Sequence, residues 1–186
     1  MFTHLFRRSG DTGLLVVGMM GVKLGERVAQ MGCVDGGRLG AIAKKVGLSG
    51  RTVAIVPDEA SAARALRGAA EAGALVEIET APPTNVPLDE GAFDLVVVDD
   101  TAGLMGSMRE DDRSALVGEA LRILRPGGRA MVIGSTPPSW LRAFLMRTPS
   151  GPACDAAPVL QAGGFKSVRV LAERAGLIFV EGIKAR

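Results

Sequence analysis

The sequence predicts one α/β domain whose core is a mostly parallel β-sheet. Short apolar runs alternate along the middle of the chain with segments whose apolar residues recur at helical spacing, which is the pattern of parallel strands joined by helical crossovers. The 186 residues, 47% of them hydrophobic, suit a single compact core. The chain closes on two strand-like runs that predict a hairpin. We therefore expect a segment with a packing helix at residues 1–24 and one α/β domain at residues 25–186.

The first strand and the first helix of this domain are expected on either side of a glycine-rich turn. Residues 27–33 predict the strand, which leads into the turn at 32–37. The helix that follows has apolar residues at helical spacing, places Arg38 toward water and ends at Gly47.

The remaining elements follow in alternation. Residues 93–98 form the most hydrophobic run, which predicts a central strand covered on both faces. A sharp turn is expected at 125–128, before the next strand. Other strands are expected at residues 52–56, 75–79 and 130–133, and the hairpin strands at 166–172 and 176–183. Other helices are expected from Pro57 and Asp58 to Gly73, and at residues 114–124, 136–146 and 158–162.

Composition argues against several classes of function. The formal net charge is +2 with the charges scattered, so no specific nucleic-acid surface is expected. Cys33 and Cys154 are isolated, which argues against a disulfide framework and a zinc site and favours the reducing cytoplasm, with no metal. The apolar run at 13–22 is too short for a transmembrane segment. His4, the single histidine, lies near the N-terminus and is not expected to be catalytic.

Four short motifs occur in order along the predicted strands. They are GERV at 25–28, Gly32-Cys33 in the turn, FDLV at 93–96 and LRILRPGG at 121–128. Together they resemble the class I S-adenosylmethionine-dependent methyltransferases, and LRILRPGG is the most specific of the four. The resemblance covers the chain from about residue 21 to its C-terminus.

This resemblance implies both a topology and a cofactor. It implies a seven-stranded sheet of order 3-2-1-4-5-7-6, with the seventh strand antiparallel and helices on both faces. S-adenosylmethionine would lie over the carboxyl ends of strands one, two and four, where open α/β sheets bind ligands. A glycine turn that opens a helix directs backbone N–H groups at an anion, here the carboxylate of the cofactor. The implied cofactor-binding residues are Gln30, Gly32, Val34, Gly36, Val56, Asp58 and Asp99.

Several of these positions differ from the family pattern. Gln30 stands where the first strand usually ends in an acid, and Val34 replaces the middle glycine of the turn. Val56 stands where an acid usually binds the ribose, and Pro82 where an acid often contacts the adenine. Asp58 has two interpretations, a ribose contact or the cap of the next helix, and the cap is the commoner role.

The consecutive acids Asp99 and Asp100 are the candidate catalytic residues. They follow the predicted central strand, where a general base or a metal ligand is conceivable. An equally good interpretation is that they hold a loop. Methyl transfer mainly needs an aligned nucleophile and the exclusion of water, so the family often has no dedicated catalytic side chain.

Three functions remain open at this point. The first is methyl transfer from S-adenosylmethionine to an unidentified small-molecule or protein substrate. The second is a noncatalytic relative that acts as a binding or structural subunit of a larger complex, and the third is binding of another nucleotide or metabolite. A protein partner would bind through the N-terminus or through an apolar stripe, whose other possible roles are to cover a substrate pocket or to pack in the core. The stripe consists of Trp140, Leu141, Phe144 and Leu145.

Overall fold

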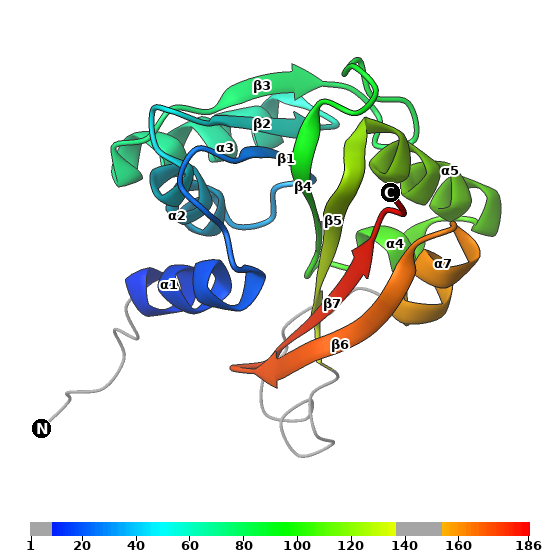
Figure 1. The fold of residues 1–186 in the computed structure, drawn as a ribbon. Coiled ribbons are helices and arrows are strands. Elements are labelled where there is room, and N and C mark those ends of the chain that lie inside the picture. The colour runs from blue at the N-terminus through cyan, green and yellow to red at the C-terminus, as the bar shows by residue number, and fades with distance from the viewer. Residues whose placement is uncertain (1–8, 137–153) are drawn as a thin grey trace, which may run out of the picture.

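The described residues, 9–136 and 154–186 of a computed structural model, form one seven-stranded sheet with helices on both faces (Figure 1). The strands are β1 (Arg27–Met31), β2 (Arg51–Val56), β3 (Glu77–Thr80), β4 (Phe93–Asp100), β5 (Leu124–Ser135), β6 (Lys166–Arg174) and β7 (Leu177–Ile183). The helices are α1 (Ser9–Met20), α2 (Gly36–Val46), α3 (Glu59–Ala72), α4 (Leu104–Ser107), α5 (Glu110–Ile123) and α7 (Ala156–Ala162).

The strand order is β3-β2-β1-β4-β5-β7-β6. The first five of these strands pair in parallel, whereas β7 is antiparallel to both of its neighbours, β5 and β6. The predicted α/β class and the topology implied by the family resemblance are therefore confirmed. The central position of β4 agrees with its mainly apolar and buried sequence, because a parallel strand covered by helices is buried on both faces.

Alternate side chains of each strand point to opposite faces of this sheet. We call the face covered by α1, α2 and α3 the α2 face, and the face covered by α4, α5 and α7 the α5 face. Leu95 and Val97 of β4 pack on the α2 face with residues of α1 and α2. Val96 and Val98 pack on the α5 face with residues of α5 and α7. Consecutive residues of one strand thus enter separate cores.

The helices on the α2 face begin and end at residues that the sequence identifies. Asp35 precedes α2 and Asp58 precedes α3, and each carboxylate accepts hydrogen bonds from N–H groups of the first turn. Gly47 follows α2 with φ +70° and Gly73 follows α3 with φ +65°, values that favour glycine. The predicted stops of both helices and the predicted start of α3 are confirmed, whereas α2 begins at Gly36, inside the turn expected at 32–37.

Helix α1 packs against the α2 face, as the apolar run at 13–22 predicts. Val16 and Met20 are fully buried, and Arg129 of β5 donates from Nη1 to the Met20 carbonyl (2.9 Å). The same guanidinium lies beside the carboxylates of Glu26 (3.3 Å) and Glu181 (3.7 Å). Among the described residues no helix has the length and apolar character needed to cross a membrane.

Three local features differ from the sequence expectations. Strand β4 continues through Asp99 and Asp100, because both keep the ladder with β5. Strand β5 begins at Leu124 and so runs through the turn expected at 125–128, since Gly127 and Gly128 make backbone hydrogen bonds with Lys184. The hairpin turn consists of Ala175 and Gly176 instead of the three residues expected at 173–175, because both have positive φ and match a two-residue turn.

Some expectations concern residues outside the described part of the chain, and one observed helix was not expected. His4 and the stripe of Trp140, Leu141, Phe144 and Leu145 lie outside the described residues. The one-turn helix α4 (Leu104–Ser107) was not predicted, because four residues are too few to show a helical period.

Candidate functional site

The sheet reverses its order between β1 and β4, and this point defines the candidate site. From β1 the chain crosses to β2 on one side, while β4 lies on the other side. Open α/β sheets bind ligands outside the carboxyl ends of their strands at such a reversal. The glycine-rich turn after β1 lies there.

Gly32 makes the turn possible. Its φ is +79°, and an added Cβ would lie 3.4 Å from both the Asp99 carbonyl oxygen and the Leu104 side chain. Its N–H donates to the Ile55 carbonyl at 2.9 Å, which ties the turn to the end of β2. A side chain at this position would be strained by the backbone before any ligand is considered.

Asp99 holds the turn from the end of β4. Its carboxylate accepts from the Val34 N–H (2.9 Å), from the Thr101 hydroxyl (2.6 Å) and from Nη2 of Arg38 (3.2 Å to each oxygen). Only 1% of the residue is exposed. The side chain therefore fixes the loop, the second of the two roles considered for it.

Arg38 is a candidate site residue that the sequence interpretation missed. We expected it to face water, yet its side chain is 9% exposed and lies under the turn, paired with Asp99. Its Nε is buried and has no hydrogen-bond partner among the described residues, and the nearest Asp35 oxygen is 3.9 Å away. Buried donors are normally paired, so this atom marks a position that favours a ligand acceptor. The residue lies three positions after Asp35, but its pairing with Asp99 spans 61 residues and leaves no local signal.

Asp35 caps helix α2. Its Oδ1 accepts from the N–H groups of Gly37 (2.9 Å) and Arg38 (3.4 Å). Two of the donors at this helix N-terminus are thus already satisfied within the chain.

Gln30, Cys33 and Val34 complete the turn. The Gln30 side chain is buried on the α2 face and donates to the Gly32 carbonyl at 3.0 Å. Burial raises the pKa of the Cys33 thiol to about 11, with a further increase from nearby Asp99, so the thiol stays protonated at neutral pH. Val34, at 40% exposure, is the open part of the turn.

Gly36 serves helix packing in this structure. An added Cβ would collide with the Arg64 carbonyl oxygen and approach Gly68 of α3 at 3.3 Å. Helices α2 and α3 therefore meet backbone to backbone at this point. The glycine is needed here whether or not a ligand is bound.

Val56 and Asp58 do not supply a carboxylate at the end of β2. Val56 is fully buried in a cluster with Leu39 and Ala65, so an acid at this position would enter the core. Asp58 caps α3 through the Ser61 N–H (2.7 Å), and this bond lowers the pKa of its carboxyl. Pro82 is exposed in the loop after β3.

Asp100 lies on the other face of the sheet from Asp99. It is 5% exposed, and its Oδ1 accepts from the Met105 N–H at 2.7 Å. Burial raises the pKa of its carboxyl to about 6, and the neighbouring charge of Asp99 adds to the increase. Because the two side chains point to opposite faces, they do not form a joint metal site. The described residues hold no group of three or more metal-ligating side chains of the His, Cys, Asp and Glu types.

Two kinds of comparison with known proteins agree with this geometry. A family model described as a methyltransferase domain matches residues 28–128, which is more than half of the chain. A solved S-adenosylmethionine-dependent methyltransferase from Aquifex aeolicus superposes with a TM-score of 0.72 at 19% identity, over 92% of this chain and 88% of that one. This chain belongs to the methyltransferase domain family, within the class I S-adenosylmethionine-dependent superfamily.

Other relatives show that the fold is shared more widely than one activity. An S-adenosylmethionine-dependent O-methyltransferase from Thermotoga maritima superposes with a TM-score of 0.68 at 16% identity, over all of this chain and 68% of that one. The cyclase SpnF superposes with a TM-score of 0.69 at 16% identity, over 99% and 85% of the two chains.

A sequence relative of uncharacterised function comes from Streptomyces fradiae. It is a 37.1 kDa protein in the transposon Tn4556, 34% identical over 116 residues. The match covers 62% of this chain and 31% of that protein, so this chain spans about a third of the length of the curated relative.

Proposed function

We propose that this chain binds S-adenosylmethionine at the carboxyl ends of β1, β2 and β4 and transfers its methyl group to a substrate. The observation that carries the proposal is the buried, unpaired Nε of Arg38 beneath the glycine turn, at the reversal of the sheet. A donor left unpaired in a buried position favours an anionic or neutral acceptor. The family membership supports the same cofactor.

The methionine end of the cofactor fits the residues that are present. Its carboxylate would accept a hydrogen bond from Nε of Arg38. It would also lie near the positive N-terminal end of α2, a helix of 11 residues. Asp99 would keep Arg38 and the turn in place through its bonds to Val34 N–H and Nη2. Asp35 takes up the N–H groups of Gly37 and Arg38, so Arg38 Nε is the stronger anchor of the two.

The ribose end has fewer polar groups from this chain. Val56 lies in the core, and the Asp58 carboxylate is engaged with the first turn of α3. A charged hydrogen bond contributes roughly 1.5–3 kcal/mol, so its loss weakens binding about tenfold or more. We expect a cofactor affinity below that of relatives that keep an acid at this position.

The bound cofactor would supply an electrophilic methyl group on a sulfonium. This chain would hold the cofactor and the substrate in the orientation that the transfer needs. Methyl transfer needs an aligned nucleophile and the exclusion of water more than it needs an acid or a base. The fixed turn at Gly32 and the buried Arg38–Asp99 pair provide a rigid support for that alignment.

Calorimetric titration with S-adenosylmethionine and S-adenosylhomocysteine tests the proposal. The full chain should release or absorb heat on binding both ligands, and R38Q should weaken both about tenfold or more because the buried donor is lost. K45Q removes a positive charge from the exposed side of the same helix and should bind like the wild type. A folded wild-type chain that binds neither ligand at millimolar concentration would refute the proposal.

A noncatalytic role is the second candidate, and one observation favours it. The carboxylates of Asp35 and Asp99 already satisfy three backbone N–H groups of the turn, so the turn is stable without a ligand. The cyclase SpnF shares this fold, so the fold alone does not establish methyl transfer. In the same titration, this role predicts a folded chain that does not bind the cofactor.

A further inference from the structure

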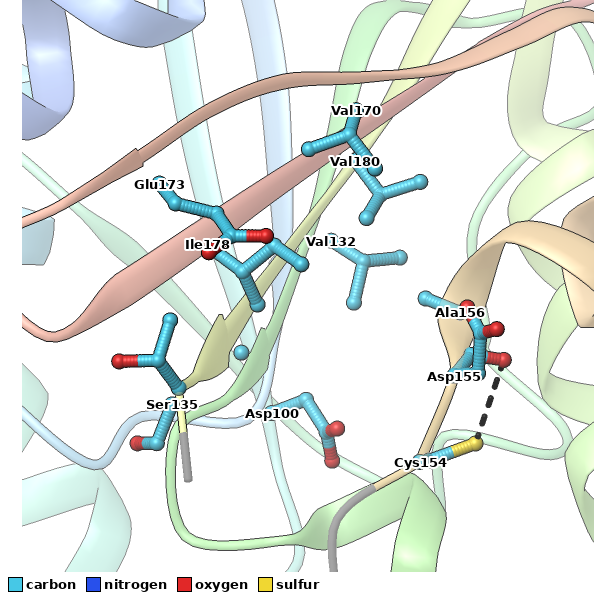
Figure 2. Close-up of a pocket in the computed structure, with 12 residues that line it drawn as sticks. Asp100, Val132, Ser135, Cys154, Asp155, Ala156, Val170, Glu173, Ile178 and Val180 are labelled. Atoms are coloured by element: carbon cyan, nitrogen blue, oxygen red, sulfur yellow. Dashed lines mark hydrogen bonds between the residues drawn. The ribbon is translucent and has the colours of Figure 1, made fainter. Parts of the chain in front are cut away.

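A cavity of about 530 Å³ lies on the α5 face, apart from the glycine turn. It is bounded by the carboxyl ends of β4 and β5, by β6 and β7, and by the start of α7. Figure 2 shows Asp100 between the end of β5 at Ser135 and the segment of Cys154 and Asp155. Pockets for small molecules usually have volumes of about 300–1,000 Å³, so the cavity has room for one.

The walls of this cavity are largely apolar. Val132, Ile178 and Val180 contribute aliphatic side chains from β5 and β7, and Ala156 adds a methyl group from α7. Burial of an apolar ligand surface against such walls contributes roughly 25 cal/mol per Å² removed from water. The walls therefore favour a ligand that is mainly hydrocarbon.

The charged side chains that line the cavity are all acidic among the described residues. Asp100 is buried, whereas Asp155 and Glu173 are exposed at the edge. The Asp155 carboxylate accepts from the Ala157 N–H at 3.2 Å as the cap of α7. The described lining contains no Lys, Arg or His. Charge complementarity thus favours a cation and disfavours a carboxylate ligand.

We propose that this cavity binds a small, mainly apolar molecule that carries an amine, with the protonated amine placed against Asp100. A charged hydrogen bond of this kind is about twice as strong as a neutral one, particularly away from water. The site belongs to the opposite face of the sheet from Arg38 and does not depend on the proposed cofactor.

The ionisation of Asp100 is consistent with this ligand. Burial raises the pKa of its carboxyl to about 6, so the charged form is costly in the empty cavity but still predominates at pH 7.5. A ligand cation beside the carboxylate offsets that cost. A neutral or anionic ligand does not.

Three ligands that share a 2-phenylethyl group and differ in their polar end test the proposal without any cofactor present. We would titrate the full chain at pH 7.5 with phenethylamine, 2-phenylethanol and 3-phenylpropionate, and follow the methyl resonances of Ile178 and Val180. The amine should bind most tightly, at least tenfold better than the alcohol, and the carboxylate should bind least. Perturbed resonances should include Ile178 and Val180.

The variant D100N separates the charge from the shape of the cavity. Asn keeps an oxygen that accepts from the Met105 N–H, so the fold should be retained. D100N should reduce the preference for the amine about tenfold while leaving alcohol binding unchanged. D89N, which removes one acidic charge at an exposed position outside the cavity, should bind all three ligands like the wild type.

Two results would overturn the proposal. One is that the wild-type chain does not prefer the amine, whether it binds the amine and the carboxylate equally or binds none of the three ligands. The other is an amine preference that persists in folded D100N. Because S-adenosylmethionine is absent, neither result depends on whether the methyltransferase proposal is right.

Discussion

Asp99 and Asp100 are consecutive in β4, but their side chains have different hydrogen-bond partners on the two faces of the sheet. On the α2 face Asp99 meets a guanidinium, a hydroxyl and two backbone N–H groups. On the α5 face Asp100 meets one described backbone N–H, and burial raises its pKa. The difference teaches that side-chain alternation along a strand can assign a structural role to one residue and ligand access to the next.

Helix glycines on the two sides of the sheet also have different surroundings. On the α2 face, Gly36 and Gly68 bring the backbones of α2 and α3 into direct contact. Gly118 of α5, on the other side of the sheet, is exposed to solvent and has nothing within 4 Å of an added Cβ. The first two glycines therefore serve a helix contact, whereas Gly118 does not, and the space beside Asp100 is the cavity described above.

The largest effect should come from breaking the buried pair on the α2 face. R38M leaves Asp99 buried without its cation, and removing one partner of a buried pair typically costs about 3–5 kcal/mol. The remaining donors to Asp99 place the expected loss near the low end, at about 3 kcal/mol. Urea denaturation at pH 7.5 measures the loss in unfolding free energy.

A double-mutant cycle sharpens this result. In R38M/D99N no buried charge is left unpaired, so the double variant should lose about 1–2 kcal/mol less than the sum of the single variants. Strict additivity would show that the pair is not coupled. In that case Arg38 would not stabilise the charge of Asp99, which is what distinguishes Asp99 from Asp100 in this comparison.

The pH dependence of stability should distinguish Asp100 on the α5 face. Its folded pKa of about 6 exceeds the ordinary value of 3.8, so its stabilising contribution is present below about pH 4 and is lost as the pH rises through 6. D100N should therefore be more stable than the wild type at pH 7.5, by up to about 3 kcal/mol, and similar to it at pH 4.

Urea denaturation of both proteins between pH 4 and pH 7.5 measures this difference. Other carboxylates affect the two curves equally and drop out of the comparison. The exposed variant D89N should follow the wild-type curve at every pH. Parallel curves for D100N and the wild type would mean that Asp100 ionises as an ordinary surface acid.

The smallest expected effects compare one glycine from each face. In G68A the new methyl group collides with the Gly36 backbone, and overpacking of this kind costs roughly 1–3 kcal/mol. In G118A the methyl group has open space within a helix and should stabilise by up to about 1 kcal/mol. Thermal denaturation of both variants, with Tm changes of opposite sign expected, measures the contrast. A loss in both would contradict it.

The fold was largely predictable because its signals are local. The helix cap at Asp58, the glycine stops at Gly47 and Gly73, and the apolar run of β4 each specify a boundary within a few residues. The strand order came from the family resemblance instead, since pairing between distant strands has no local signal.

The location of the candidate site was predictable from the sequence, but the contacts of its side chains were not. The turn at Gly32 lies where the resemblance puts it, whereas Arg38 was expected in water. Its burial depends on Asp99, 61 residues away, and no helical pattern reports such a partner. The cavity was not predicted either, because its walls come from four strands and α7, which only the folded chain brings together.

The attachment of α1 to the sheet bears on how much of this chain forms one cooperative unit. Val16 and Met20 cover the α2 face, and Arg129 joins the end of α1 to β5 across 109 residues. The family match at 28–128 includes neither α1 nor the β6–β7 hairpin. A fragment cut to those limits would end inside β5, lose the residues from Arg129 onward that pair with β4, and so expose the core of β4. The segment recognised by sequence is therefore smaller than the segment that folds.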